Sequence, residues 1–174
     1  MATYKRPTSY PKKASKPSAY IPIMVGVGAT LNGLANNAQA ACLDQALVNP
    51  QTSQAYGRGV LKGLRFQARI VSDVVLQGAL ELLLLILPTG MAVPTVNTVA
   101  TVKANERFIW LRGLSEAHSP EGVTCVHLWD ANPGTKRRYE MNDRLVLVVV
   151  NRGGVALGAA TGGLVAADVF AEED

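Results

Sequence analysis

Histidine and cysteine are the residue types that most often act as general bases, nucleophiles or transition-metal ligands, and the sequence contains two of each: His118, His127, Cys42 and Cys125. Catalysis and metal binding need several such side chains close together in space. In a sequence, zinc sites are usually recognised by closely spaced pairs such as C-x-x-C. None of the four has a companion at that spacing. We therefore interpret His127 as a packed or interface histidine and both cysteines as small buried residues. Sparse, unpaired cysteines are typical of a reducing compartment.

The motifs of common enzyme classes are also missing from the sequence. GVGATLNG begins with Gly26 and Gly28, but Leu31 stands where a dinucleotide-binding fingerprint needs its third glycine. There is no G-x-x-x-x-G-K-[ST], no G-x-S-x-G and no H-E-x-x-H, and the carboxylates form no obvious pair. We therefore predict that the protein is not an enzyme and that it uses no cofactor and no metal.

The clearest chemistry in the chain is electrostatic and lies at its start. MATYKRPTSYPKKASKP contains no acidic residue, and the first carboxylate of the chain is Asp44. The arm, residues 1–20, carries five cations: Lys5, Arg6, Lys12, Lys13 and Lys16. The other 12 cations and 13 anions sum to −1, so the arm supplies the whole net charge of +4. A basic tail on a near-neutral body predicts a polyanionic partner, and its tyrosines could stack on bases.

Two further groups of cations lie in the body of the chain. Arg65 and Arg69 stand four residues apart in a strand-like segment, where they would project from one face, so we predict that they bind nucleic acid with the arm. Lys136, Arg137 and Arg138 form the second group. The alternative for both groups is pairing with acids such as Glu140 and Asp143, or protection of a sheet edge.

These cations must be positioned by strands, because helical periodicity is nearly absent. GLRFQARIVSD alternates apolar and polar residues with period two, and GVTCVHLWD does the same. Residues 20–31 are expected to be extended and residues 101–114 to form a strand, whereas residues 31–48 could form a short helix that Asn49 and Pro50 would end. Many short strands joined by turn signals predict an all-β sandwich or closed barrel.

The apolar run from Val74 to Leu87 raises the alternative of a membrane span. It has fourteen residues, includes Gln77 and Glu81, and stops at Pro88. A spanning helix needs about 20 apolar residues, and an ionised side chain inside it is costly. We therefore favour a long strand that is buried on both faces over a membrane helix.

The order of these segments resembles the capsid proteins of small icosahedral viruses, particularly those with circular single-stranded DNA genomes. The likeness rests on the arm MATYKRPTSYPKKASKP, on the cation-bearing early strand GLRFQARIVSD and on the late segment TKRRYEMNDRLVLVVVN. The resemblance implies a basic arm over residues 1–20 and one eight-stranded antiparallel jelly roll over residues 21–174. Small plant satellite viruses with RNA genomes have a similar architecture, so the genome type stays open.

The resemblance further implies a closed shell of about 60 copies of this chain, with the arms directed inward to viral nucleic acid, and it favours single-stranded DNA as that nucleic acid. It implies a location in the virion and leaves open the host nucleus as a site of assembly. A neighbouring subunit would then cover the second apolar face of residues 79–87.

Two functions from other classes remain alternatives at this point. One is a monomeric or small-oligomer β-barrel that binds single-stranded nucleic acid, which should carry aromatic side chains on one exposed strand face. Phe66, Phe108 and Trp110 are the candidates, and their positions in strands suggest that they belong to the core. The other alternative is a small membrane protein.

Overall fold

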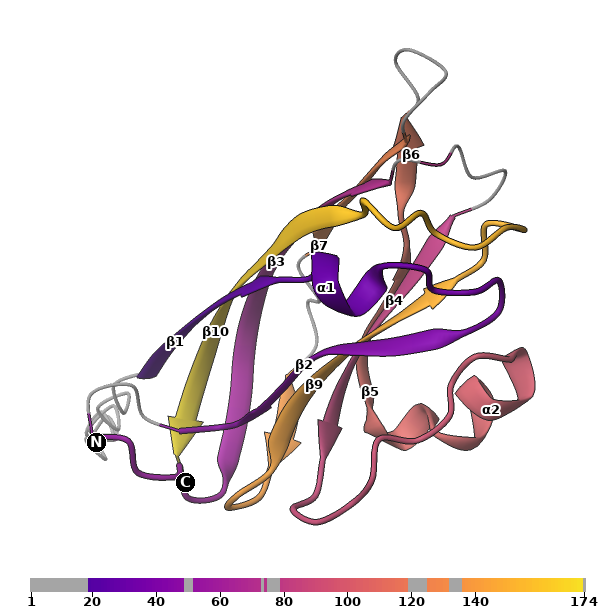
Figure 1. The fold of residues 1–174 in the computed structure, drawn as a ribbon. Coiled ribbons are helices and arrows are strands. Elements are labelled where there is room, and N and C mark those ends of the chain that lie inside the picture. The colour runs from indigo at the N-terminus through magenta and orange to yellow at the C-terminus, as the bar shows by residue number, and fades with distance from the viewer. Residues whose placement is uncertain are drawn as a thin grey trace, which may run out of the picture.

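The computed structural model describes residues 19–48, 52–72, 74, 79–118, 125–131 and 136–173. It consists of two antiparallel β-sheets packed face to face, with two short α-helices at the periphery (Figure 1). The predicted all-β sandwich is therefore confirmed.

The larger sheet has six strands in the order β1-β10-β3-β7-β6, with β8 paired to β3 as well. These strands are β1 (Ala19–Gly26), β10 (Gly162–Glu173), β3 (Gly59–Ser72), β7 (Cys125–Ala131), β6 (Glu116–His118) and β8 (Arg137–Tyr139). The smaller sheet has the order β2-β9-β4-β5. Its strands are β2 (Gln39–Ala46), β9 (Arg144–Asn151), β4 (Leu80–Leu87) and β5 (Ile109–Leu114).

The pairing of the eight longer strands is nested along the chain. β4 pairs with β5, β3 with β7, β2 with β9 and β1 with β10, so each pair encloses the one before it. The pairings of β10 with β3 and of β9 with β4 then join the four pairs into two sheets. This wrapping of a folded ribbon is the eight-stranded jelly roll that the resemblance implied. β6 and β8, of three residues each, are additions to it.

The main core lies between the two sheets and follows from the alternation of side chains along each strand. In β10, Val165, Val169 and Ala171 are buried, whereas Leu164 and Phe170 face solvent. Leu82 and Leu84 of β4 pack against this inner face from the opposite sheet within the same buried cluster. Trp110, Trp129 and Tyr139 fill the same layer, which places most of the described aromatic side chains inside the protein.

β4 is buried on both faces, as its uninterrupted apolar sequence predicts. A second cluster covers its outer face, and its buried members are Leu83, Leu85, Leu87, Val96, Val102, Val146, Val148 and Val150. Val96 and Val102 belong to the connection from β4 to β5, which contains α2 (Val99–Ala104) and the 3-10 helix η1 (Glu106–Phe108). The expectation that a neighbouring subunit provides this cover is therefore wrong, because the chain covers the face itself.

Three local expectations from the sequence are also corrected. The short helix expected over residues 31–48 does not form, because this segment contains the strand β2. A single helical turn, α1 (Gly28–Leu31), instead ends the segment 20–31, of which only the part in β1 is extended as expected. Pairing of β2 with β9 and burial of Cys42 override the helical preference of this alanine-rich segment. Within the strand expected at residues 101–114, only β5 is extended, because the reciprocal hydrogen bonds of Thr98 and Thr101 start α2.

The apolar run at residues 74–87 ends in the strand β4. Among the described residues, the longest helix is α2 with six residues, and no helix is long and apolar enough to cross a membrane.

Candidate nucleic-acid interface

The basic arm enters the jelly roll at the start of β1, where Ala19 pairs with Ala171 near the end of β10. Figure 1 shows the start of β1 and the arrowhead of β10 at the same end of the sandwich. The arm cations themselves lie outside the described residues: Lys5, Arg6, Lys12, Lys13 and Lys16. The structure thus fixes the point from which the arm departs, at one end of the six-stranded sheet.

Arg65 and Arg69 lie on β3, and both are exposed. Ala68 and Ile70 of the same strand are buried in the core, so the two arginines occupy the outer face of the six-stranded sheet. The prediction that they share one face is confirmed. Their position on one face follows from the alternation of side chains along the strand, because residues four apart in a strand point the same way.

The neighbours of these arginines reduce the charge of that face. Arg65 lies directly opposite Asp168 of β10, and Gln67 lies opposite Asp130 of β7. Arg69 lies between Leu164 and Leu128, both of which are exposed. Cross-strand neighbours of opposite charge attract each other, so this face is electrically mixed and not a continuous positive surface.

A second group of cations gathers at the end of the sheet where the arm departs. Arg58 and Lys62 lie at the start of β3, and Lys136, Arg137 and Arg138 lie at and just before β8, which pairs with that same stretch of β3. Lys62 forms an ion pair with Glu172. Within the described part of the chain, neither Lys136 nor Arg138 takes part in an ion pair, and both are exposed.

The register relates this group to the arm. Ala19 pairs with Ala171, Ala171 with Leu61, and Leu61 with Arg137. Three steps of about 4.8 Å between neighbouring strands separate the arm's first strand from β8 by about 14 Å. One polyanion could therefore contact the base of the arm and the cations of β8 together.

Glu81 is the only buried carboxylate that the described residues contain, and it serves the fold. It lies on the outer face of β4, where Arg112 Nε donates to Oε1 at 2.5 Å and Arg152 Nη2 donates to Oε2 at 2.6 Å. Arg152 also donates to the carbonyl of Asn97. The carboxylate thereby ties β4 to β5, to the end of β9 and to the connection that covers the sheet.

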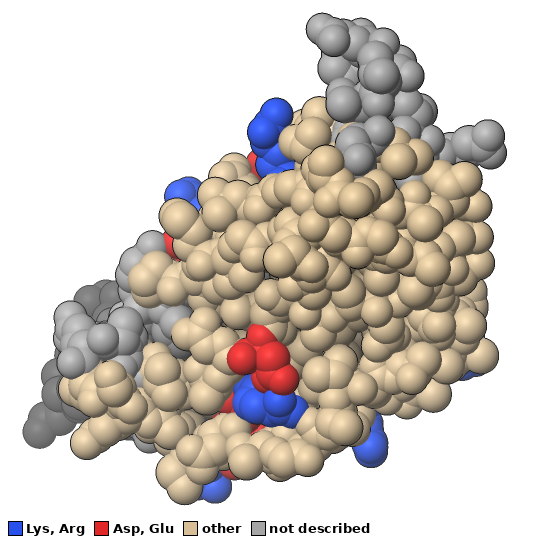
Figure 2. All heavy atoms as spheres, viewed as in Figure 1, with Lys and Arg blue, Asp and Glu red and all other residues tan. Residues whose placement is uncertain are grey.

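Asp44 and Arg144 form a further bidentate pair, in which Nη1 lies 2.7 Å from Oδ1 and 2.5 Å from Oδ2, and it links β2 to β9. Arg144 also donates to the carbonyl of Met91. Elsewhere charges are sparse on the view in Figure 2, where small blue and red groups interrupt a broad uncharged surface over α1, β2 and β9. Few ionised side chains would therefore have to be desolvated if this surface met another protein.

His127 is fully buried on β7, which confirms it as a packed histidine. Its Nδ1 lies 2.9 Å from Ser115 Oγ, and that oxygen accepts a hydrogen bond from the Leu80 amide at 3.0 Å. Burial lowers the pKa of His127 from 6.5 to about 4, so the ring is neutral at pH 7. The side chain of His118 lies outside the described part.

Cys42 is buried on β2 as a free thiol, and burial raises its pKa to about 12. The thiolate is the reactive form of cysteine, so Cys42 is inert in the folded protein. The side chain of Cys125 lies outside the described part. Within the described residues, no group of three histidine, cysteine, aspartate or glutamate side chains could hold a metal ion.

No family model matches the chain, and no curated protein matches it. The solved structures that it resembles include the X-ray structure of tomato aspermy virus, with 13% identity, a TM-score of 0.40, and coverage of 100% of this chain and 88% of that one. Desmodium yellow mottle tymovirus gives 12% identity and a TM-score of 0.34 over 98% and 96% of the two chains. The structure of Mud crab tombus-like virus has 12% identity and a TM-score of 0.29, with coverage of 100% of this chain and 89% of that one. At these TM-scores the likenesses assign no function.

Two features of the structure could not be predicted from the sequence. The first is the closeness of Lys136 and Arg138 to the arm, which depends on the pairing of β8 with β3. The second is the pairing of Glu81 with Arg112 and Arg152, which brings together three strands far apart in the sequence. A carboxylate inside an apolar run was the only signal in the sequence that a buried partner was needed.

Proposed function

We propose that this protein is a structural capsid protein that self-assembles into a closed shell and packages nucleic acid through its basic N-terminal arm. The observation that carries the proposal is the combination of a jelly roll with nested strand pairs and a five-cation arm that enters β1. Jelly rolls occur in viral capsids, lectins and cupins, and of these roles the capsid is the one in which a basic arm meets a polyanion, the packaged nucleic acid.

Packaging would be electrostatic and independent of sequence. Lysines and arginines of the arm displace the counterions that condense on phosphates, so the affinity falls steeply as salt rises. The five charges of one arm would bind nucleic acid weakly, whereas many arms that contact one polymer bind it together with a much higher overall affinity. We propose about 60 copies in closed point-group symmetry, with single-stranded DNA as the genome.

Within this proposal the body of the protein adds contacts to the phosphates near the arm. Lys136 and Arg138 are suited to this role because they are exposed and lie at the end of the sheet from which the arm departs, three strand spacings from β1. Arg65 and Arg69 would contribute less, since Asp168 and Asp130 share their face. The protein would act without catalysis.

The described surface favours a shell over a monomeric barrel that stacks bases. Trp110 and Trp129 are each 7% exposed and Tyr139 is 2% exposed, so they form no stacking platform. Exposed apolar side chains instead lie on the outer face of the six-stranded sheet, including Met24, Leu164 and Leu128. Such side chains suit a contact with a neighbouring subunit.

The decisive experiment separates assembly from packaging. The purified full-length chain should form closed particles under the electron microscope, with absorbance at 260 nm that reports nucleic acid. A variant in which glutamine replaces all five arm cations, Lys5, Arg6, Lys12, Lys13 and Lys16, keeps the length of the arm and should form particles without nucleic acid.

Two results would contradict the proposal. A species of 18.5 kDa under all conditions would reject self-assembly and favour the monomeric module. Particles of the glutamine variant with unchanged absorbance at 260 nm would reject the arm as the packaging element.

A further inference from the structure

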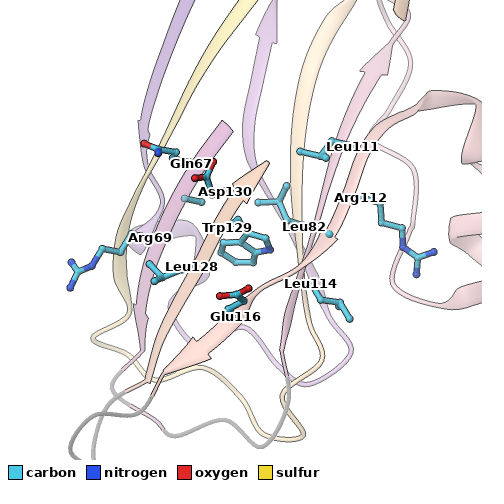
Figure 3. Close-up of a pocket in the computed structure, with 12 residues that line it drawn as sticks. Gln67, Arg69, Leu82, Leu111, Arg112, Leu114, Glu116, Leu128, Trp129 and Asp130 are labelled. Carbon is cyan, nitrogen blue, oxygen red and sulfur yellow. The ribbon is translucent and has the colours of Figure 1, made fainter. Parts of the chain in front are cut away.

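A groove of about 650 Å³ lies on the outer side of the four-stranded sheet, where the edge strand β5 meets the start of α2. Arg112 pairs with Leu83 and Leu114 with Glu81, so both side chains of β5 belong to this outer face. Figure 3 draws a hollow between β5 and β7 that shares Arg112 and Leu114 with the groove, and both side chains point away from Trp129 there. Clefts that bind small molecules have volumes of about 300–1,000 Å³.

The charges that line the groove do not cancel. Glu81 is its one carboxylate, and Arg112 and Arg152 are its two cations, so the sum is +1. A second hollow, which shares Val99 and Arg112 with the groove, adds Lys103 and Glu106, whose charges cancel each other. A net positive charge attracts an anion and repels a cation, so the groove favours an anionic ligand.

Arg112 has the geometry to bind such an anion. Its Nε donates to Oε1 of Glu81 at 2.5 Å, and the side chain is 49% exposed. The two Nη groups have no hydrogen-bond partner in the part of the chain that the structure describes. Together they form a planar fork that matches the two oxygens of a carboxylate. Because Glu81 already holds Nε, the guanidinium would lose little conformational freedom when a ligand binds.

The groove also offers apolar contacts beside this fork. Val99 of α2 is 75% exposed and Leu114 of β5 is 64% exposed, and both line the groove. A ligand with an apolar body would remove part of these two side chains from water. The groove therefore suits a molecule that has a charged end and an apolar end.

We propose that this groove binds a small carboxylate with an apolar body, whose two oxygens receive the Nη groups of Arg112 and whose apolar part packs on Val99 and Leu114. A carboxylate balances the local charge of +1. A phosphate monoester carries about −1.5 to −2 at pH 7 and would leave an excess of negative charge beside Glu81. The groove lies within one subunit, so the proposal does not rest on the capsid function and stands if that function is rejected.

The test compares two probes of nearly equal shape, 2-naphthoate, which is ionised at pH 7, and the neutral 2-naphthamide. Equilibrium dialysis against the full-length protein measures their dissociation constants. The naphthoate should bind about three- to tenfold more tightly, because its hydrogen bonds are charge-assisted but half exposed to solvent. Failure of the naphthoate to bind, or equal dissociation constants for the two probes, would overturn the proposal.

Arg112→Gln locates the binding. The glutamine can still donate to Glu81, but it lacks the charge and the fork, so the naphthoate should bind about three- to tenfold more weakly and the naphthamide equally well. Arg107→Gln removes the same charge from an exposed residue of η1 that does not line the groove, and it should leave both dissociation constants unchanged. Equal effects of the two substitutions would overturn the proposal. A larger loss for 2-naphthyl phosphate than for 2-naphthoate in Arg112→Gln would overturn the choice of a carboxylate.

Val99→Asp tests the groove without changing the partners of Glu81. Val99 is exposed, so the variant should fold, and its new carboxylate should weaken the binding of the naphthoate more than that of the naphthamide. Urea denaturation checks that each variant is folded. Binding of the naphthoate to Val99→Asp with unchanged affinity would place the ligand elsewhere and overturn the proposal.

Discussion

Ser115 Oγ lies 2.9 Å from Nδ1 of His127 and accepts a hydrogen bond from the amide of Leu80 at 3.0 Å, so one hydroxyl between β5 and β6 links β7 to β4 where the chain crosses from one sheet to the other. Nε2 of the same ring is buried without a partner among the described residues. The imidazole therefore has no acceptor for a second proton, and its surroundings favour the neutral form.

This arrangement predicts a specific dependence of stability on pH. The pKa of His127 is about 4 in the folded protein and 6.5 without the effect of burial. As the pH falls below 6.5 the unfolded chain binds a proton that the folded chain does not, so the free energy of unfolding decreases down to about pH 4. The full effect is about 3 kcal/mol at ~1.4 kcal/mol per pKa unit. Urea denaturation of the native protein and of His127→Gln at pH 7 and pH 4.5 measures it.

The comparison between variants isolates the histidine from the carboxylates that also titrate at low pH. His127→Gln should lose less stability between the two pH values than the native protein. Ser115→Ala removes the hydroxyl but keeps the imidazole, so it should be less stable at both pH values and retain the difference between them. An identical pH response of the native protein and His127→Gln would show that the ring is not neutral and buried.

The sequence was sufficient for the class of fold, because strand periodicity is local. The alternation in GLRFQARIVSD reflects a strand with one buried face, and the unbroken apolar run of β4 reflects a strand that is buried on both faces. The jelly roll itself came from a resemblance, since the nesting of β1 with β10 spans the whole chain and leaves no local pattern. The helix expected over residues 31–48 failed for the same reason, as long-range pairing with β9 decided its conformation.

The candidate interface was only partly predictable. Arg65 and Arg69 were assigned to one face correctly, but nothing in the sequence places Asp168 opposite Arg65, about a hundred residues away along the chain. The closeness of Gly113 and Trp129 could not be predicted either, because the two residues meet only when the sheets pack. Contacts between strands of different sheets depend on register and packing, which no single segment encodes.

A second prediction concerns Glu81 and its two arginines. Arg112→Met with Arg152→Met leaves the carboxylate, which is 2% exposed, without a cation, and this should lower the free energy of unfolding by about 3–5 kcal/mol. Adding Glu81→Met to that pair should restore part of the loss, because three apolar side chains replace an unpaired buried charge. Urea denaturation of the double and triple variants measures both steps. A triple variant less stable than the double variant would contradict this account.

The salt dependence of binding distinguishes the two groups of cations on the body. Each phosphate contact contributes about 0.7 to the slope of log K against log salt for single strands. We expect Lys136→Gln with Arg138→Gln to reduce the magnitude of that slope by about 1.4 for a single-stranded oligonucleotide. Arg65→Gln with Arg69→Gln removes the same charge and should reduce it less, because of Asp168 and Asp130. An equal reduction of the slope by the two double variants would contradict this prediction, because Arg65 and Arg69 would then contribute as much to the interface as Lys136 and Arg138.

The cover of β4 by its own connection gives the last prediction. Val102 is 4% exposed and packs with Leu83 and Leu85, whereas Val99 on the same helix is 75% exposed. Val102→Asp should destabilise the isolated subunit by about 3 kcal/mol or more, since an unpaired carboxylate must be buried or α2 must leave the sheet. Val99→Asp makes the same change on the exposed side and should have little effect. Urea denaturation of unassembled subunits decides between them. If Val102→Asp left subunit stability unchanged, the apolar face of β4 would need another cover, and only a neighbouring subunit could then provide it.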